Sequence, residues 1–141
     1  MLFRSHWETL KGSRRFPARR ELHPRDIVPI LTHLLLVRVL DGGADFEIRI
    51  AGEVQLRTYA IPFAGKRLSE LKNTNPAYGY IIGGLFNHVA EFGEPVALRG
   101  NFAPGFANVR IAYCETAILP LGEAETIDHL LGFTAFVGNG A

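Results

Sequence analysis

His88 has the most obvious chemical use of any residue in the chain. A histidine titrates near neutral pH, so it can act as a general base or ligate a metal. It follows Leu85 by three residues and Ile81 by seven, which on a helix places it at the edge of an apolar stripe. One reading is a small α+β enzyme with an isomerase- or dehydratase-like cavity, in which His88 is the general base. We favour the other reading, a partly buried, hydrogen-bonded histidine without a catalytic role.

Cys114 is the only cysteine, which excludes a disulfide scaffold. It lies in an expected strand, where a small packed residue is the reading we favour over a nucleophile. Asp128 and His129 are neighbours in another strand, so we expect their side chains to point to opposite faces. The sequence contains no hydrolase, Walker or dinucleotide-binding motif, and its histidines lack metal-ligand spacing. We therefore expect no catalytic residues and no metal site.

A short N-terminal helix precedes the rest of the chain. Ser5 and Glu8 have the spacing of a capping box, and Phe3, Trp7 and Leu10 fall on one face. An isolated helix this short is marginal unless its apolar face is packed. We therefore expect Phe3, Trp7 and Leu10 to form a dimer or docking contact.

Two further helices are expected in the middle of the chain. Residues 52–60 form a short one, with Val54 and Leu56 turned inward. Residues 76–92 form a long one, because an asparagine-proline pair is a typical helix start and Gly93 a typical stop. Two consecutive glycines inside this helix indicate close packing or a nearby ligand.

Five segments have the length, branched residues or alternation of β-strands, at residues 34–40, 46–50, 96–102, 109–119 and 127–137. With the helices, they predict an α+β fold: a five-stranded antiparallel sheet with helices on one face and an N-terminal cap helix. We divide the chain into a cap helix with a basic linker, residues 1–22, and a domain of residues 23–141.

Composition and charge limit the function further. The 141 residues are 48% hydrophobic and 21% charged, as expected for one folded domain. No apolar run is long enough to span a membrane and no signal peptide is evident, so we expect a cytoplasmic protein. Residues 1–26 carry seven Lys/Arg and three acidic residues, a net charge of +4, against −3 for the remainder. We favour a solvated docking segment over an anion-binding one, and the absence of nucleic-acid motifs predicts no nucleic-acid partner.

Several short motifs follow one another along the chain at a characteristic spacing. They are Trp7 with Leu10, Arg14 to Arg19 (R-x-x-P-A-R), Glu21 to Ile27 (with Glu in place of the first Asp of D-x-x-P-x-D-I), Arg49 to Gly52 (R-x-x-G), Gly65 with Leu68 and Leu71, and Pro120-Leu121. In this spacing the chain resembles a PAS family that is frequent as short stand-alone proteins in alphaproteobacteria. It departs from that pattern between Gly52 and Gly65, beside the pocket of PAS folds.

The resemblance implies a sensory or protein-interaction module, often dimeric, with a cavity between sheet and helices and no catalytic residues. It is compatible with a small-molecule ligand in an apolar pocket, for which the candidate residues are Tyr59, Phe63, Ile81, Leu85, His88, Val89, Leu98, Tyr113 and Phe133. For the four aromatic candidates, Tyr59, Phe63, Tyr113 and Phe133, we favour ordinary core packing. The chain ends four residues after Val137, so we expect its output to go through a homodimer or a signalling partner protein.

The resemblance also gives His88 a further reading. In oxygen-sensing PAS domains a histidine on the long helix ligates haem iron, and Arg99 on the next strand would match their ligand-pairing arginine. The residues around His88 do not match that haem-binding subfamily. Haem ligation through His88 is therefore an option that we do not favour.

Overall fold

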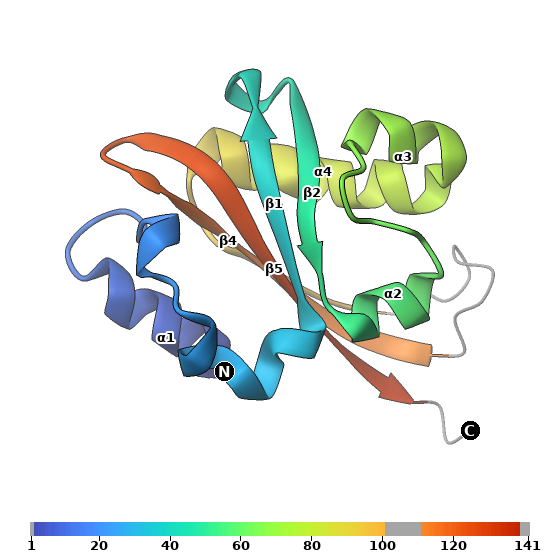
Figure 1. Cartoon of the computed structure of the whole chain (residues 1–141), viewed down its shortest axis with the longest axis horizontal. Coiled ribbons are helices and arrows are strands. Elements are labelled where there is room, and N and C mark those ends of the chain that lie inside the picture. Colours follow the sequence, from blue (N-terminus) through green and yellow to red (C-terminus); the bar gives the residue numbers. More distant parts are fainter. Residues whose placement is uncertain (1, 101–110, 139–141) are drawn as a thin grey trace.

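The computed structural model describes residues 2–100 and 111–138 (Figure 1). Its strands are β1 (Leu34–Leu40), β2 (Asp45–Ala51), β3 (Val96–Gly100), β4 (Ile111–Glu123) and β5 (Thr126–Gly138). Its α-helices are α1 (Leu2–Lys11), α2 (Glu53–Tyr59), α3 (Leu68–Thr74) and α4 (Pro76–Phe92). Short 3-10 helices are η1 (Arg19–Glu21), η2 (Pro24–His33) and η3 (Asp41–Gly43).

The five strands form one antiparallel sheet in the order β2-β1-β5-β4-β3. The first strand of the chain thus pairs with the last in the middle of the sheet, where Leu36 lies opposite Leu131. The predicted fold class, a five-stranded antiparallel sheet with helices and an N-terminal helix, is confirmed.

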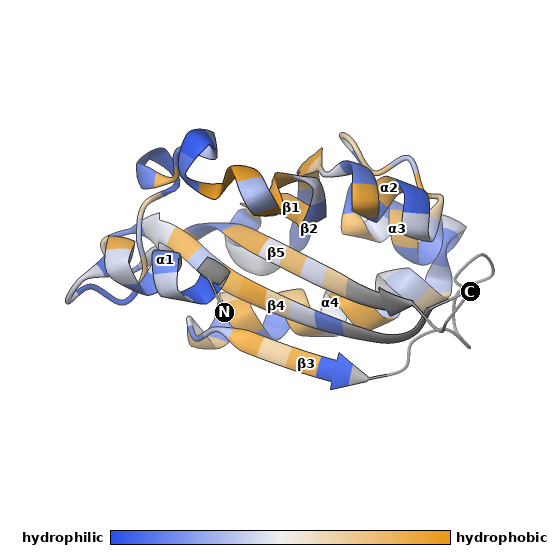
Figure 2. Ribbon diagram, turned by 90° about the horizontal axis from the view of Figure 1, so that it is seen from below, coloured by the Kyte–Doolittle hydropathy of each residue, from blue (hydrophilic) through white to orange (hydrophobic). Residues whose placement is uncertain are grey.

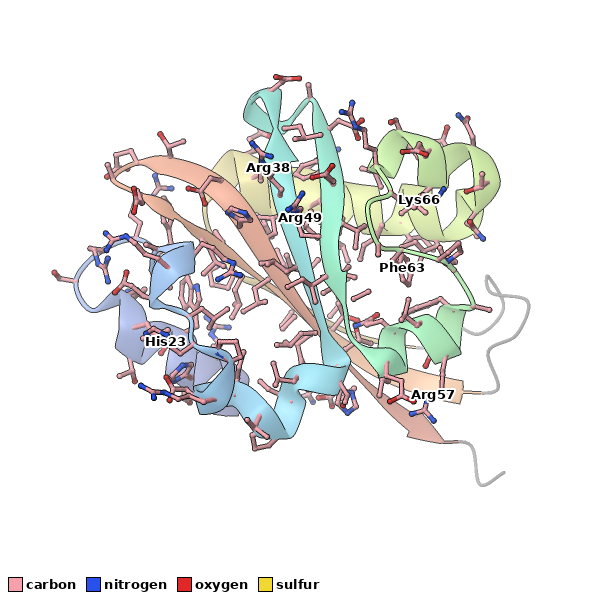
Figure 3. The ribbon with its side chains drawn as sticks, viewed as in Figure 1. His23, Arg38, Arg49, Arg57, Phe63 and Lys66 are labelled. Atoms are coloured by element: carbon pink, nitrogen blue, oxygen red, sulfur yellow. The ribbon has the colours of Figure 1, made fainter. Side chains whose placement is uncertain are left out.

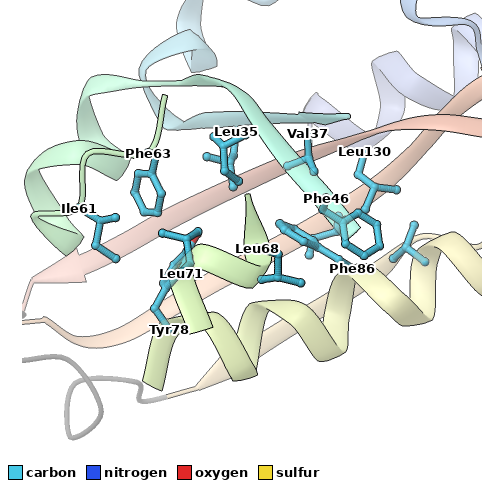
Figure 4. Packing of buried hydrophobic residues seen from close by; sticks show 13 residues of the cluster. Leu35, Val37, Phe46, Ile61, Phe63, Leu68, Leu71, Tyr78, Phe86 and Leu130 are labelled. Carbon is cyan, nitrogen blue, oxygen red and sulfur yellow. The ribbon is translucent and has the colours of Figure 1, made fainter. Parts of the chain in front are cut away.

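Both faces of the sheet are covered by hydrophobic packing. Helices α3 and α4 cover one face, with Leu71, Phe86 and Val89 packed against the sheet residues Phe46 and Leu130 (Figure 4). The N-terminal elements cover the other face and form a second hydrophobic cluster with it. The clusters on the two faces meet only at their edges. In Figure 2 the middle stretches of β4 and β5 are coloured as hydrophobic, as expected for strands buried on both faces.

The long helix begins and ends where the sequence predicts. Pro76 is its first residue, and Gly93 follows it with φ +69°, a left-handed conformation that glycine adopts readily. Gly79 and Gly83 lie against α3; a Cβ at Gly79 would come within 2.8 Å of the Lys72 backbone, whereas Gly84 has open space around it. The expected close packing is therefore at Gly79 and Gly83.

One expectation about the N-terminal helices is wrong. Helix α1 begins at Leu2, so Ser5 lies inside it, where its carbonyl accepts a bond from the Thr9 hydroxyl, and does not cap it. The 3-10 helix η2 contains Pro29 and runs to His33, with a kink at Ile27. A single residue predicts the end of a helix only weakly, because packing against the rest of the chain can override its preference.

Candidate functional site

A cavity lies between the sheet and helices α2 and α4, with about 30 Å³ of room. Its wall is formed by Leu35, Gln55, Tyr59, Tyr78, Ile81, Ile82, Leu85, Phe86, Thr116, Ile118, Gly132 and Thr134. Ile81 is 43% exposed and so marks the mouth of the cavity. The room suffices for about two water molecules.

Gln55 places the main polar group in this wall. It is 2% exposed, and its Nε2 donates a hydrogen bond of 2.8 Å to the carbonyl oxygen of His33. Its Oε1 makes no hydrogen bond within residues 2–100 and 111–138. An acceptor is thus available to a ligand that brings a hydroxyl or N–H group.

Two threonines on neighbouring strands complete the polar part. The hydroxyls of Thr116 on β4 and Thr134 on β5 are 3.3 Å apart, and either can donate to the other. The Thr134 carbonyl oxygen lies 2.9 Å from His33 Nδ1. His33 therefore touches the cavity wall twice, through Gln55 and through Thr134.

Aromatic rings close one side of the cavity. The rings of Tyr59 and Tyr78 are 4.8 Å apart between centroids, and Phe63 stands 5.1 Å from Tyr78. Burial, with a smaller contribution from Tyr59, raises the pKa of Tyr78 well above its usual value, so its phenol stays neutral. No Asp, Glu, Lys or Arg is among the lining residues that the structure describes, which favours an uncharged occupant.

Three of the candidate pocket residues line this cavity, namely Tyr59, Ile81 and Leu85. Phe63 and Val89 are buried in the adjoining core without lining it (Figures 3 and 4). The side chains of Tyr113 and Cys114 lie outside the described residues.

His88, Leu98 and Phe133 are not in the cavity wall. His88 is exposed on α4, with its ring centroid 4.8 Å from that of Phe92, and Leu98 is 36% exposed. Phe133 packs on the opposite face of the sheet. This arrangement does not fit haem held in the cavity through His88, and it gives His88 no access to a substrate there.

The side chains of Asp128 and His129 do not point apart as expected. His129 Nδ1 lies 2.8 Å from Asp128 Oδ1. The pairing of β4 with β5 shifts register just before His129, which disturbs the alternation on which the expectation rested. Within the described ranges no group of three or more His, Cys, Asp or Glu is placed to hold a metal.

Gln55 is a polar residue of the candidate site that sequence reasoning missed. The expected phase of the helix turned Val54 and Leu56 inward, but Leu56 is 39% exposed and Gln55 is buried. A seven-residue helix has too few turns for its apolar pattern to define a face. The available signal was the tyrosine four residues after Gln55, which shares its side of the helix.

Trp7 is buried against its own sheet. It is 4% exposed, and its Nε1 donates a 2.9 Å hydrogen bond to the carbonyl oxygen of Pro120. Trp7 is thus occupied within the chain and is not free for the expected dimer contact, because the far face of the sheet is itself apolar. Leu10 is partly exposed, and the side chain of Phe3 is outside the described residues.

Ion pairs attach the basic segment to the turn between β4 and β5. Arg15 pairs with Glu125 at 2.9 Å and Arg20 with Glu123 at 2.7 Å. The backbone N–H of Gly122 donates to the Pro17 carbonyl oxygen at 2.9 Å. Part of the N-terminal positive charge is therefore neutralised within the fold.

Glu21 predicts one pH effect on stability. Hydrogen bonds from the Arg14 guanidinium, then from the Ala18 backbone N–H, lower the pKa of Glu21 to about 2. Its contribution is present above pH about 4.5 and is lost as the pH falls toward 2. Since the pair is partly exposed, we expect Glu21→Gln to cost about 1 kcal/mol at pH 7.

Urea unfolding from pH 7 to pH 2.5 checks this. The difference between wild type and Glu21→Gln should shrink over the acid range. A constant difference at every pH would show that Glu21 acts by packing alone.

The sheet order, the helices on one face and the small cavity between them define the class of protein, a sensory or interaction domain of the PAS fold. The chain belongs to the PAS domain family, since the family's sequence model matches residues 1–133. Such domains are generally sensory modules without an enzymatic activity of their own.

Among solved structures the chain is similar to the PAS domain of BvgS from Bordetella pertussis. The TM-score is 0.56 at 16% identity, over 79% of this chain and 83% of the other. This likeness concerns the fold. No curated protein matched the sequence. No helix in the described parts of the chain is long and apolar enough to cross a membrane.

Proposed function

We propose that this PAS domain senses a small, uncharged and mainly apolar molecule bearing one hydrogen-bond donor. The observation that carries the proposal is Gln55, whose carbonyl oxygen is unpaired among the described residues at the end of an apolar cavity. A ligand that donates a hydrogen bond to this oxygen gains free energy on binding that an apolar ligand of the same size does not gain. Charged molecules are disfavoured because none of the described lining residues offers a countercharge.

A ligand must widen the cavity as it enters. A cavity that admits benzene holds about 150 Å³, several times the room present. Tyr59 and Ile81 are among the wall side chains that are not buried, and we propose that these two move aside. Binding would then act on α2 and, through Gln55 and Thr134, on His33.

The response would pass to a signalling partner protein or to a second copy of the chain. His33 is the last residue of η2, which runs along the sheet face turned away from the cavity. We propose that residues 1–22, the cap, transmit the change from a sensing domain of residues 23–141. Light scattering on the full chain, with and without phenol, shows whether a homodimer forms and responds.

Gly132→Ala tests the cavity directly. A Cβ at this position would point into the cavity and meet Leu35 Cβ at 3.5 Å, an ordinary contact. We expect the variant to be more stable by about 0.5 to 1 kcal/mol, because alanine loses less backbone entropy than glycine. Its methyl group takes up most of the room, so binding of phenol should weaken about tenfold or more.

Three probes of one size separate the contributions: phenol with a donor, toluene without one, and benzoate with a charge. Binding followed by NMR should decrease from phenol to toluene to benzoate in the wild type. Gln55→Leu should remove the preference for phenol over toluene. Gly84→Ala adds a methyl group in open space and serves as the control. Equal binding of all three probes, or unchanged phenol binding in Gly132→Ala, would contradict the proposal.

A further inference from the structure

An apolar groove lies on the other face of the sheet, beneath η1 and η2. It has about 80 Å³ of room and is lined by Arg19, Leu22, Pro24, Ile27, Leu31, Leu34, Leu36, Ile50 and Leu131. Eight of these nine residues are apolar. The groove is separated from the cavity by the sheet itself, because Leu34 and Leu36 point to one face of β1 and Leu35 to the other.

The rim of the groove exposes large hydrophobic side chains to water. Ile50 is 54% exposed and Leu31 is 36% exposed. Val28, 60% exposed, precedes Leu31 by three residues in a 3-10 helix, so the two side chains lie on one side of it. Exposed apolar residues gathered beside an apolar groove are typical of a binding surface.

The charge at the groove is positive. Arg19 is its charged wall residue, and it forms no ion pair with any described residue. Its neighbours Arg14 and Arg20 are neutralised by Glu21 and Glu123. None of the described residues that line the groove is acidic.

A second unpaired arginine lies past the groove floor. Arg38 follows Leu36 by two residues on β1, on the same face, and it too has no ion pair in the described parts of the chain. Figure 3 shows Arg38 beside Arg49, which is itself paired with Glu47 at 3.1 Å. An anionic group in the groove would find the guanidinium of Arg19, which binds carboxylates well, and Arg38 offers a second guanidinium farther along β1, outside the groove lining.

We propose that this groove binds a medium-chain aliphatic carboxylate. Its room corresponds to about five to eight water-sized groups, and a methylene group is of similar size, which fits a chain of six to eight carbons. The apolar walls hold the chain, and Arg19 or Arg38 holds the carboxylate. Such a ligand would sit between η2 and the sheet and fasten the N-terminal segment to it.

Octanoate, octanol and octyltrimethylammonium test the proposal on the full chain. Methyl NMR should show saturable shifts at Leu36, Ile50 and Leu131, with octanoate bound most tightly and the ammonium compound least. Arg19→Gln should weaken octanoate binding about fivefold and leave octanol binding unchanged. If this single variant has no effect, the double variant Arg19→Gln with Arg38→Gln should weaken octanoate binding instead. Ile50→Glu should abolish binding of octanoate, whereas Leu56→Glu, at a similarly exposed residue outside the groove, should not.

The result separates this groove from the cavity described above. Gly132→Ala should leave octanoate binding unchanged. Shifts confined to Ile81 and Ile118, or loss of binding in Gly132→Ala, would place octanoate in the cavity and overturn the proposal. Equal affinity for octanoate and octyltrimethylammonium, or the absence of saturable shifts, would also overturn it.

Discussion

Trp7→Ala is expected to lower the free energy of unfolding by about 3 to 5 kcal/mol, the usual cost of removing a buried large aromatic residue. Trp7 is 4% exposed and lies in the cluster that joins α1 to the sheet. The substitution also leaves the Pro120 carbonyl oxygen without the indole N–H. Urea unfolding followed by circular dichroism measures the loss.

Two comparisons separate the ring from its hydrogen bond. Trp7→Phe keeps most of the apolar surface and should cost about 1 to 2 kcal/mol, since it mainly removes one buried hydrogen bond. Leu10→Ala, at a partly exposed position of the same helix, should cost less than Trp7→Ala. A loss below 1 kcal/mol in Trp7→Ala would show that α1 is not part of the cooperative fold.

The tryptophan also reports on the cap in the wild type. It is the only tryptophan in the sequence, so the intrinsic emission comes from the buried surface under α1. If the cap and the sheet unfold together, emission and circular dichroism follow the same curve in urea. An earlier change in emission would mean that the cap leaves first.

Gly79→Ala is expected to lower the free energy of unfolding by about 1 to 3 kcal/mol, as overpacking usually does. The added Cβ would lie 2.8 Å from both the Cα and the backbone N of Lys72. These are backbone atoms of α3, so relief requires moving the helix rather than turning a side chain. The intrinsic preference of helices for alanine offsets only part of the cost.

Gly84→Ala is the matched control on the same helix. Its Cβ meets nothing within 4 Å, and the residue is exposed. We expect a gain of about 0.5 to 1 kcal/mol from helix propensity alone. If the two variants changed stability alike, the close approach of α3 and α4 at Gly79 would have no energetic weight.

Strong local signals made the strands and the long helix predictable. Alternation marked β2, and the Asn75-Pro76 pair with Gly93 marked both ends of α4. These signals act through the backbone of the residues themselves, so distant packing rarely overrides them. Alternation alone did not predict the order of the strands in the sheet, because it does not say which strands are neighbours.

The cavity residues were only partly predictable, for two physical reasons. Phe133 was a pocket candidate because it is an aromatic residue of an expected strand, but both faces of the sheet are buried, and its face is the one under the cap. Gln55 was missed because α2 is short and its polar residue is the buried one. Trp7 was taken for an intermolecular contact because a sequence does not show that a distant strand lies beneath it.

The position of β5 between β1 and β4 has a consequence for how the chain assembles. Strands β1 and β5, which pair in the middle of the sheet, are separated by more than 80 residues in the sequence. The middle of the sheet therefore cannot form until the β4–β5 hairpin has been synthesised. Trp7 also waits for a distant partner, because Pro120 lies 113 residues along the chain. Contacts of such sequence separation slow folding. Helix α1 is therefore synthesised well before the strand to which it bonds.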